Sequence, residues 1–332
     1  MNPFQYATAT TPDEAISLVG KNGRYLGGGI DLLDEMKAYI LSPDVLVDVK
    51  SVNPLLGGKA NPIVFVGHTG VPGSSVCNLE SSVTIAQMAS DANLQKYYPG
   101  LVEAASEVGS PQIRNVATLA GNLLQHSRCW YYRQPDIVCL KRGGNTCFAQ
   151  EGENKYSSLF SGCACISPVV SNLAVILTAL DAWINIRSKG KDQKISVDML
   201  YHSAWHEPFA HNSLKAETFL TGVSLHTQRN RSAYRQISEK SSFDWALVSC
   251  AAAGNVANGK ITDARVVLGA VAPVPYMVKE ANDFLEGKPL TDETASKAAD
   301  IILKDAKPLA QNGYKVPLAH TLIRRTLLAL NS

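Results

Sequence analysis

Residues 25–33 have the sequence YLGGGIDLL, in which three consecutive glycines separate two regular elements. Residues 24–26 are typical of a strand end, 27–29 of a tight loop, and 30–38 of a helix. A glycine loop lets backbone N–H groups approach a pyrophosphate closely. The spacing matches neither GxGxxG nor the GxxxxGK motif, so the stretch by itself indicates either a phosphate cradle or a plain turn.

The residues around this stretch predict a small α/β unit. Thr11, Pro12 and Asp13 form a helix start with a capping hydroxyl and proline at the first helical position, and Gly20 ends the helix. The apolar run VLVDV at 45–49 predicts a buried strand. We therefore expect a first lobe over residues 1–55.

A second lobe is predicted over residues 56–228. Its segment SPQIRNVATLAGNL at 110–123 has turn chemistry at both ends and little helical periodicity, so we expect a second loop there. The two loops could converge on one dinucleotide, although this loop by itself also fits plain structure. LAVILTALDAWINI at 173–186 predicts a helix followed by a strand, and a polar connector is expected over 202–212.

The pattern changes after residue 228. Strand-like segments SAYRQIS, ALVSCAAAGNV and ARVVLGAV are followed by the helical segments TASKAADIILKDA and LAHTLIRRTLLAL. A run of strands followed by a run of helices is typical of an α+β domain, which we place at 229–332. The predicted fold class is α+β, with two α/β lobes in front of this domain.

Four spaced cysteines stand in a polar stretch, 127–166, which is expected to be a long functional loop rather than core. Cys129, Cys139, Cys147 and Cys165 could hold zinc or an iron–sulfur cluster, and Cys163 could replace Cys165 as a ligand. Structural zinc sites usually contain a CxxC knuckle, which these spacings lack, and unligated thiols are the third alternative. Cys77 and Cys250 stand alone and are expected to be inert buried thiols.

The overall composition points to no charged partner. Lysine and arginine number 31 against 29 acidic residues, which indicates neither nucleic acid nor an anionic membrane. We expect no membrane span and no signal peptide of the chain's own. His126 stands near the cysteine stretch, where it would tune a cluster or be an ordinary satisfied histidine, and no hydrolytic set of residues can be identified.

Three segments together resemble the FAD-binding medium subunits of the xanthine dehydrogenase and carbon monoxide dehydrogenase family. They are YLGGGIDLL, RNVATLAGNLLQ at 114–125 and LGAVAPVPYM at 268–277, and the likeness spans nearly the whole chain. SRCWYYRQPDIVCLKRGGNTCFAQEGENKY at 127–156 resembles the subgroup of bacterial aldehyde oxidoreductases and 4-hydroxybenzoyl-CoA reductase. The medium subunit of that subgroup carries an extra 4Fe-4S cluster.

The resemblance implies a two-lobed FAD-binding domain of the vanillyl-alcohol oxidase (PCMH) type and a C-terminal domain of the CO dehydrogenase flavoprotein type. It implies 4Fe-4S ligation by Cys129, Cys139, Cys147 and Cys165. Cys165 is chosen because the family has a cysteine a few residues before a segment that here contains Ser171 and Asn172. The FAD-binding residues that it implies are Tyr25, Leu26, Gly27, Gly28, Gly29, Ile30, Asp31, Leu32, Thr118, Leu119, Ala120, Gly121, Asn122, Asn172, Leu220 and Arg235.

Two positions depart from the family pattern. Asn172 stands where the family has aspartate, and Ile30 replaces the usual threonine of the glycine loop. An amide can still donate and accept hydrogen bonds, so FAD binding remains the expectation. The affinity and potential of the flavin are the properties that these two departures affect.

The implied function is electron transfer within a molybdenum hydroxylase complex that oxidises aldehydes or aromatic heterocycles. A large molybdopterin subunit and a small 2Fe-2S subunit would be the partners, with an external electron acceptor. Two alternatives are a stand-alone FAD-dependent oxidase or reductase of the same fold, and a non-catalytic zinc scaffold. Reduced thiols suit the cytoplasm, and co-export with a signal-bearing partner would place the complex in the periplasm.

Overall fold

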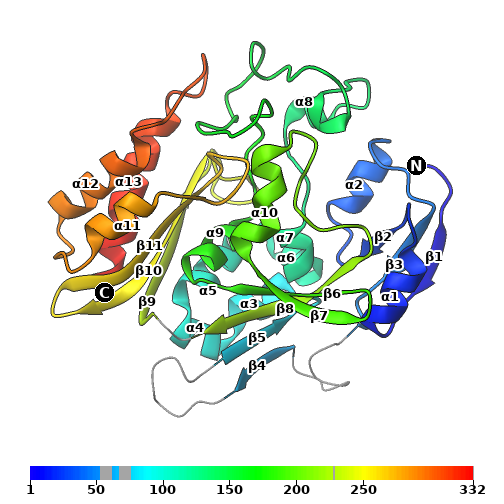
Figure 1. Cartoon of the computed structure of the whole chain (residues 1–332), viewed down its shortest axis with the longest axis horizontal. Helices are drawn as coiled ribbons and strands as arrows, with labels where there is room; N and C mark the ends of the chain where they lie inside the picture. Colours follow the sequence, from blue (N-terminus) through cyan, green and yellow to red (C-terminus); the bar gives the residue numbers. More distant parts are fainter. Residues whose placement is uncertain (53–61, 67–75, 227–228, 332) are drawn as a thin grey trace.

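The computed structural model describes residues 1–52, 62–66, 76–226 and 229–331. Their strands form three sheets, which succeed one another from the blue N-terminal lobe to the yellow and red C-terminal part (Figure 1). The predicted boundaries, between residues 55 and 56 and at 228, lie outside the described residues.

The first lobe is a three-stranded parallel sheet with two helices. Thr11 caps the first helix by accepting a hydrogen bond from the Glu14 N–H, and Gly20 ends it with φ of 56°. The second helix begins two residues later than predicted, because Ile30 and Asp31 belong to the turn. The elements are β1 (Gln5–Thr8), α1 (Pro12–Val19), β2 (Arg24–Leu26), α2 (Leu32–Lys37) and β3 (Val45–Asp48), with strand order β1-β3-β2.

The second lobe is a five-stranded antiparallel sheet covered by helices. Its apolar helix α9 is buried along almost its whole length, and the helix-then-strand prediction for 173–186 is confirmed. The strands, in the order β4-β5-β8-β6-β7, are β4 (Ile63–Val66), β5 (Val76–Glu80), β6 (Trp183–Ser188), β7 (Lys191–Ser196) and β8 (Thr218–His226). The helices are α3 (Ile85–Ser90), α4 (Ala92–Tyr97), α5 (Pro99–Ser106), α6 (Pro111–Val116), α7 (Leu119–Leu123), α9 (Asn172–Ala179) and α10 (Val197–His206).

Three predictions for this lobe were wrong. Residues 110–123 form two short helices rather than a loop, because Ser110 and Thr118 act as N-caps that accept backbone N–H bonds. The expected connector at 202–212 begins inside α10. Within the cysteine stretch, which contains α8 (Trp130–Arg133) and a 3-10 turn (Leu140–Arg142), Leu159 and Phe160 are buried in the C-terminal core.

The C-terminal domain is an antiparallel sheet with its own helices on one face and helices α5 and α9 of the second lobe on the other. Small residues on β10 alternate between its faces: Ala251 and Ala253 pack on the second lobe, and Ala252 packs toward the domain's own helices. Its strands precede its helices in the chain, which confirms the predicted α+β order. The elements are β9 (Arg231–Ile237), β10 (Val248–Ala257), β11 (Lys260–Gly269), β12 (Tyr276–Met277), α11 (Lys279–Leu285), α12 (Asp292–Leu303) and α13 (Lys315–Leu328), with a final 3-10 turn (Ala329–Asn331).

Candidate functional site

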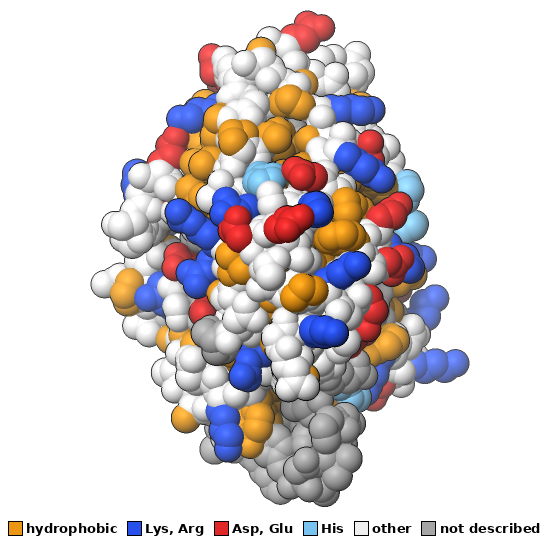
Figure 2. Space-filling model, turned by 90° about the vertical axis from the view of Figure 1, so that its left-hand side faces the viewer, with side chains coloured by type: hydrophobic (Ala, Val, Ile, Leu, Met, Phe, Trp, Pro, Cys, Tyr) orange, Lys and Arg blue, Asp and Glu red, His pale blue; other side chains and the backbone are white. Residues whose placement is uncertain are grey.

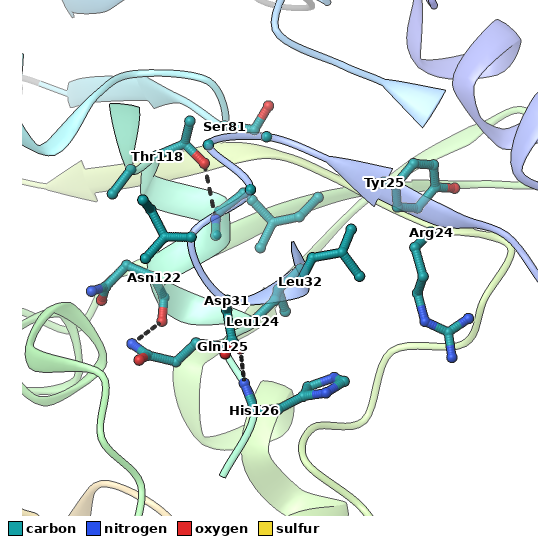
Figure 3. A pocket seen from close by; sticks show the side chains of 18 of the residues that line it. Arg24, Tyr25, Asp31, Leu32, Ser81, Thr118, Asn122, Leu124, Gln125 and His126 are labelled. Carbon is teal, nitrogen blue, oxygen red and sulfur yellow. Dashed lines mark hydrogen bonds between the residues drawn. The ribbon is translucent and has the colours of Figure 1, made fainter. Parts of the chain in front are cut away.

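A cleft of about 440 Å³ lies where the three parts of the chain meet. The glycine loop forms one wall and the turn into α7 forms another, while Asp244 and Trp245 reach it from the C-terminal domain. Figure 3 shows Thr118 and Asn122 toward one side of the cleft, Tyr25 toward the other, and Asp31 and Leu32 between them. The glycine loop and the turn between α6 and α7 therefore converge on one cleft, as was expected of the two segments.

The glycines of the first loop are needed for close packing on the second. A Cβ atom on Gly28 would lie 2.1 Å from the Val116 carbonyl oxygen, and one on Gly27 would lie 2.9 Å from Thr118 Oγ1. Gly29 has φ of 72°, in the left-handed region that favours glycine. The backbone of the loop is thus held against the turn into α7, and its three glycines line the cleft.

Polar side chains fix the turn into α7 and its neighbour α9. Asn122 accepts hydrogen bonds through Oδ1 from Ser171 Oγ at 2.7 Å and from the Leu173 N–H at 3.4 Å. Asn172 donates from Nδ2 to Gln236 Oε1 at 2.7 Å and to Tyr234 Oη at 3.0 Å. An aspartate at 172 could not donate these bonds, so the amide suits the surroundings that this chain provides.

Most of the residues predicted to bind the cofactor line this cleft, and three do not. Leu119 is fully buried in the core of the second lobe, Leu26 ends strand β2 beside the cleft, and Arg235 is exposed on β9. The predicted residues that do line the cleft are Tyr25, Gly27, Gly28, Gly29, Ile30, Asp31, Leu32, Thr118, Ala120, Gly121, Asn122, Asn172 and Leu220.

Several residues that line the cleft were not predicted from the sequence. Lys215 and Trp245 stand in segments without a motif, and no sequence signal marks them. Phe219 was not predicted either; it packs edge-on against the predicted Tyr25, with ring centroids 5.2 Å apart, and partial burial raises the pKa of the Tyr25 phenol to about 12. His126, which was expected to tune a cluster or to be an ordinary satisfied histidine, also lines the cleft.

An ionic network joins the cleft to the cysteine stretch. The Asp31 carboxylate lies 2.6 Å from the Arg133 guanidinium and 2.8 Å from that of Arg128, and it accepts the His126 backbone N–H at 2.7 Å. Arg128 also stacks over the Trp245 ring at 4.8 Å. The first lobe, the cysteine stretch and the C-terminal domain therefore meet at these charges.

The four predicted ligand cysteines line one small cavity beside this network. Cys129, Cys139, Cys147 and Cys165 share it with Tyr131, Tyr132, Lys141 and Phe148, among others. Burial raises the pKa of the Cys165 thiol to about 11 and also raises the pKa of Cys129. Cys163 does not line the cavity, and its Sγ lies 3.8 Å from the Cys165 carbonyl oxygen.

The other cysteines lie apart from this cavity. Cys77 and Cys250 are fully buried in separate cores, which confirms their prediction as buried thiols. Within the part of the chain that the structure describes, no three His, Cys, Asp or Glu side chains lie close enough together to hold a single metal ion.

Charges of both signs are mixed on one outer face of the molecule. Figure 2 shows acidic and basic side chains interspersed over the face at the C-terminal end of the molecule. Ion pairs such as Arg324–Asp292 and Lys297–Glu293 join them on and between α12 and α13. Among the described residues, no helix is both long enough and apolar enough to cross a membrane.

Two protein families account for nearly the whole chain. Residues 2–226 match the FAD binding domain in molybdopterin dehydrogenase, and residues 232–330 match the CO dehydrogenase flavoprotein C-terminal domain.

Three related proteins match over nearly their full length. The aldehyde oxidoreductase FAD-binding subunit PaoB of Escherichia coli is 30% identical, over 99% of this chain and 98% of that protein. The carbon monoxide dehydrogenase medium chain of Hydrogenophaga pseudoflava is 23% identical, over 98% and 96%. In the crystal structure of quinoline 2-oxidoreductase from Pseudomonas putida, a chain 21% identical superposes with a TM-score of 0.73, covering 99% of this chain and 97% of that one.

Proposed function

Because the chain belongs to the family of FAD-binding subunits of molybdenum-containing dehydrogenases, we propose that its cleft seats one FAD that passes electrons between iron–sulfur clusters and an external acceptor. The convergence of the glycine loop and the α7 turn on one cleft is the observation that carries the proposal. The flavin would supply the redox chemistry, while this chain binds it, orients it and tunes its potential.

The FAD pyrophosphate is assigned to the glycine loop. The close contact of Gly28 with Val116 leaves the loop backbone along the cleft, where its N–H groups can approach a phosphate without a side chain between. Thr118 to Asn122 face it from the other wall. Asn172 and Leu220, also in the wall, complete the seat, whereas exposed Arg235 contributes no contact in the cleft.

The partners follow from the relatives, whose names describe subunits or chains of larger oxidoreductases. We propose a complex with a large molybdopterin subunit, where the substrate is oxidised, and a small 2Fe-2S subunit. An aldehyde is the favoured substrate class, because the aldehyde oxidoreductase subunit is 30% identical over nearly the full chain. The same relationship supports the subunit assignment over a stand-alone oxidase or reductase.

A 4Fe-4S cluster is proposed for the cysteine cavity. Four thiols from a stretch with little regular structure line one small cavity, which agrees with ligation by Cys129, Cys139, Cys147 and Cys165. The cysteine spacings lack the CxxC knuckle that structural zinc sites usually contain, which favours a cluster over a single zinc ion. A cluster accepts thiolates that stand further apart, around its own body.

The test is a quantitative analysis of the chain purified without air. One FAD with about four irons and four acid-labile sulfides per chain is expected. Flavin with zinc instead of iron would refute the cluster but keep the subunit assignment. A chain that binds no flavin, even when assembled with its partners, would contradict the central proposal.

The compartment is proposed from the partners rather than from this chain. The chain would work in the cytoplasm, or in the periplasm if a partner with a twin-arginine signal carries the folded complex across. Fractionation of cells with and without that partner's signal distinguishes the two.

A further inference from the structure

A buried carboxylate and two partly buried imidazoles lie together beside the cleft. His126 Nδ1 lies 3.0 Å from Glu35 Oε2 and 3.1 Å from Glu35 Oε1, and the Glu35 side chain is only 1% exposed. The Tyr132 hydroxyl donates to Glu35 Oε1 at 2.7 Å, and an Arg133 nitrogen lies 3.7 Å away. Since a carboxylate only accepts, it favours a proton on His126 Nδ1.

The second imidazole is held neutral. The His211 ring stacks on the His126 ring, with centroids 4.0 Å apart and an interplanar angle of 10°. The Ser127 backbone N–H donates to His211 Nδ1 at 3.3 Å, which requires an unprotonated nitrogen there. Burial, followed by the nearby charge of His126, holds the pKa of His211 well below its ordinary value. Of this stacked pair, the His126 ring is the one that contacts the Glu35 carboxylate.

His126 is placed between this group and the cleft. Its side chain is 24% exposed and lines the cleft, and Figure 3 shows it beyond Gln125, tethered to Asp31 through its backbone N–H. The charged groups around the pair are Asp31 from the turn before α2, Glu35 from α2, Arg133 from α8, and Arg128 and Lys141 from the rest of the cysteine stretch. Among these groups, Glu35 is the carboxylate that contacts the imidazole.

Electron transfer from iron–sulfur clusters leaves the flavin in need of a proton. Clusters deliver single electrons and no proton, unlike a hydride donor, whereas a flavin reduced by two electrons takes up one proton on its ring at neutral pH. In a partly closed cleft, that proton has to come from a side chain or from water. His126 is the cleft-lining imidazole that a buried carboxylate orients.

Resting on the proposed function, we propose that His126 donates this proton to the bound flavin and that Glu35 is its positioning residue. An N–H bond of the His126 imidazolium breaks and an N–H bond forms on the flavin ring. Two electrons from the iron–sulfur clusters of the partner subunit reduce the flavin. Neutral His126 then takes a proton from water at its exposed edge, and both steps reverse when the flavin gives its electrons to the acceptor.

The test follows flavin absorbance while the FAD-loaded chain is reduced by dithionite, a one-electron donor that brings no hydride, from pH 5.5 to 9. His126→Ala is expected to be reduced about 10²-fold more slowly. Added imidazole should restore the rate, whereas an equal concentration of sodium chloride should not. Glu35→Gln should shift the pH dependence of the rate to lower pH, because it removes the charge that stabilises the imidazolium.

His126→Gln keeps a donor for Glu35 but cannot shuttle a proton, and it covers the case in which the alanine variant folds poorly. It should be as slow as His126→Ala with FAD still bound, while His202→Gln, on an exposed face of α10, should match the wild type. Wild-type rates in His126→Gln, or no rescue of His126→Ala by imidazole, would overturn the inference. Absence of FAD from the wild-type chain would instead overturn the proposed function.

Discussion

Arg133 lies 2.6 Å from the carboxylate of Asp31, 102 residues away in the chain, and so ties the cysteine stretch to the residue that follows the glycine loop. Its other nitrogens donate to the Ser127 carbonyl at 2.7 Å and to Asp34 at 3.2 Å. The side chains of Arg133 and Asp31 are 14% and 17% exposed. The proposed FAD seat and the proposed cluster site thus share one ionic contact.

We predict that Arg133→Gln weakens FAD binding about tenfold and lowers the free energy of unfolding by about 2 kcal/mol, since hydrogen bonds to charged groups are lost. Titration of flavin fluorescence and urea unfolding measure the two effects. The matched control is Arg324→Gln, which breaks an exposed ion pair with Asp292 and should cost about 0–1 kcal/mol without any change in FAD affinity. If Arg133→Gln and the wild type bind FAD with equal affinity, the ionic network does not contribute to FAD binding.

Gly28→Ala is expected to damage the site through packing alone. The new Cβ would lie 2.1 Å from the Val116 carbonyl oxygen, so the two loops must move apart, at a cost of roughly 1–3 kcal/mol. Thermal unfolding and FAD content of the purified variant measure this. Gly313→Ala is the control, because its nearest neighbour would be 3.9 Å away. The packing argument fails if both variants retain the melting temperature and FAD of the wild type.

Lys315 should make stability depend on pH. Its Nζ is buried and donates to the carbonyl oxygens of Tyr156 and Ala270, each at 2.9 Å, and burial lowers the pKa of Lys315 to about 7. Above pH 7 the unfolded chain binds the proton that the folded chain has lost, so this residue's contribution to stability rises with pH up to about 10.5.

The corresponding measurement compares wild type with Lys315→Met in urea at pH 7 and pH 9. The free energy of unfolding of the wild type, relative to that of Lys315→Met, should increase by about 2 kcal/mol from pH 7 to pH 9. Lys297→Met, which removes an exposed lysine on α12, provides the control and should show no such trend. A constant difference between wild type and Lys315→Met at the two pH values would contradict the assignment.

Cysteine substitutions should separate the two candidate ligands. Cys165→Ser is expected to lose iron and sulfide, because this thiol lines the cavity with the other three. Cys163→Ser should keep both, and Cys250→Ser, in a distant core, is a second control. Iron analysis under anaerobic conditions decides the question. Loss of iron from Cys163→Ser with full retention in Cys165→Ser would reverse the ligand assignment.

Much of the fold could be predicted from sequence because local signals agreed with it. Thr11, Pro12 and Gly20 bound α1 as predicted, since capping and helix termination depend on neighbouring residues. Residues 110–123 were wrongly predicted as a loop because serine and threonine are favoured both in turns and at helix N-caps, the position that Ser110 and Thr118 occupy here. Two helices of five and six residues are too short to show a helical period.

The sequence by itself determined the order of the elements, the family, and the grouping of four cysteines, because caps, periodicity and motifs are written in adjacent residues. Only the tertiary structure decided that Glu35 meets His126, that Asp31 meets Arg133, and that Cys165 rather than Cys163 reaches the cavity. Such contacts depend on how distant segments pack, and no local pattern near either partner encodes the position of the other.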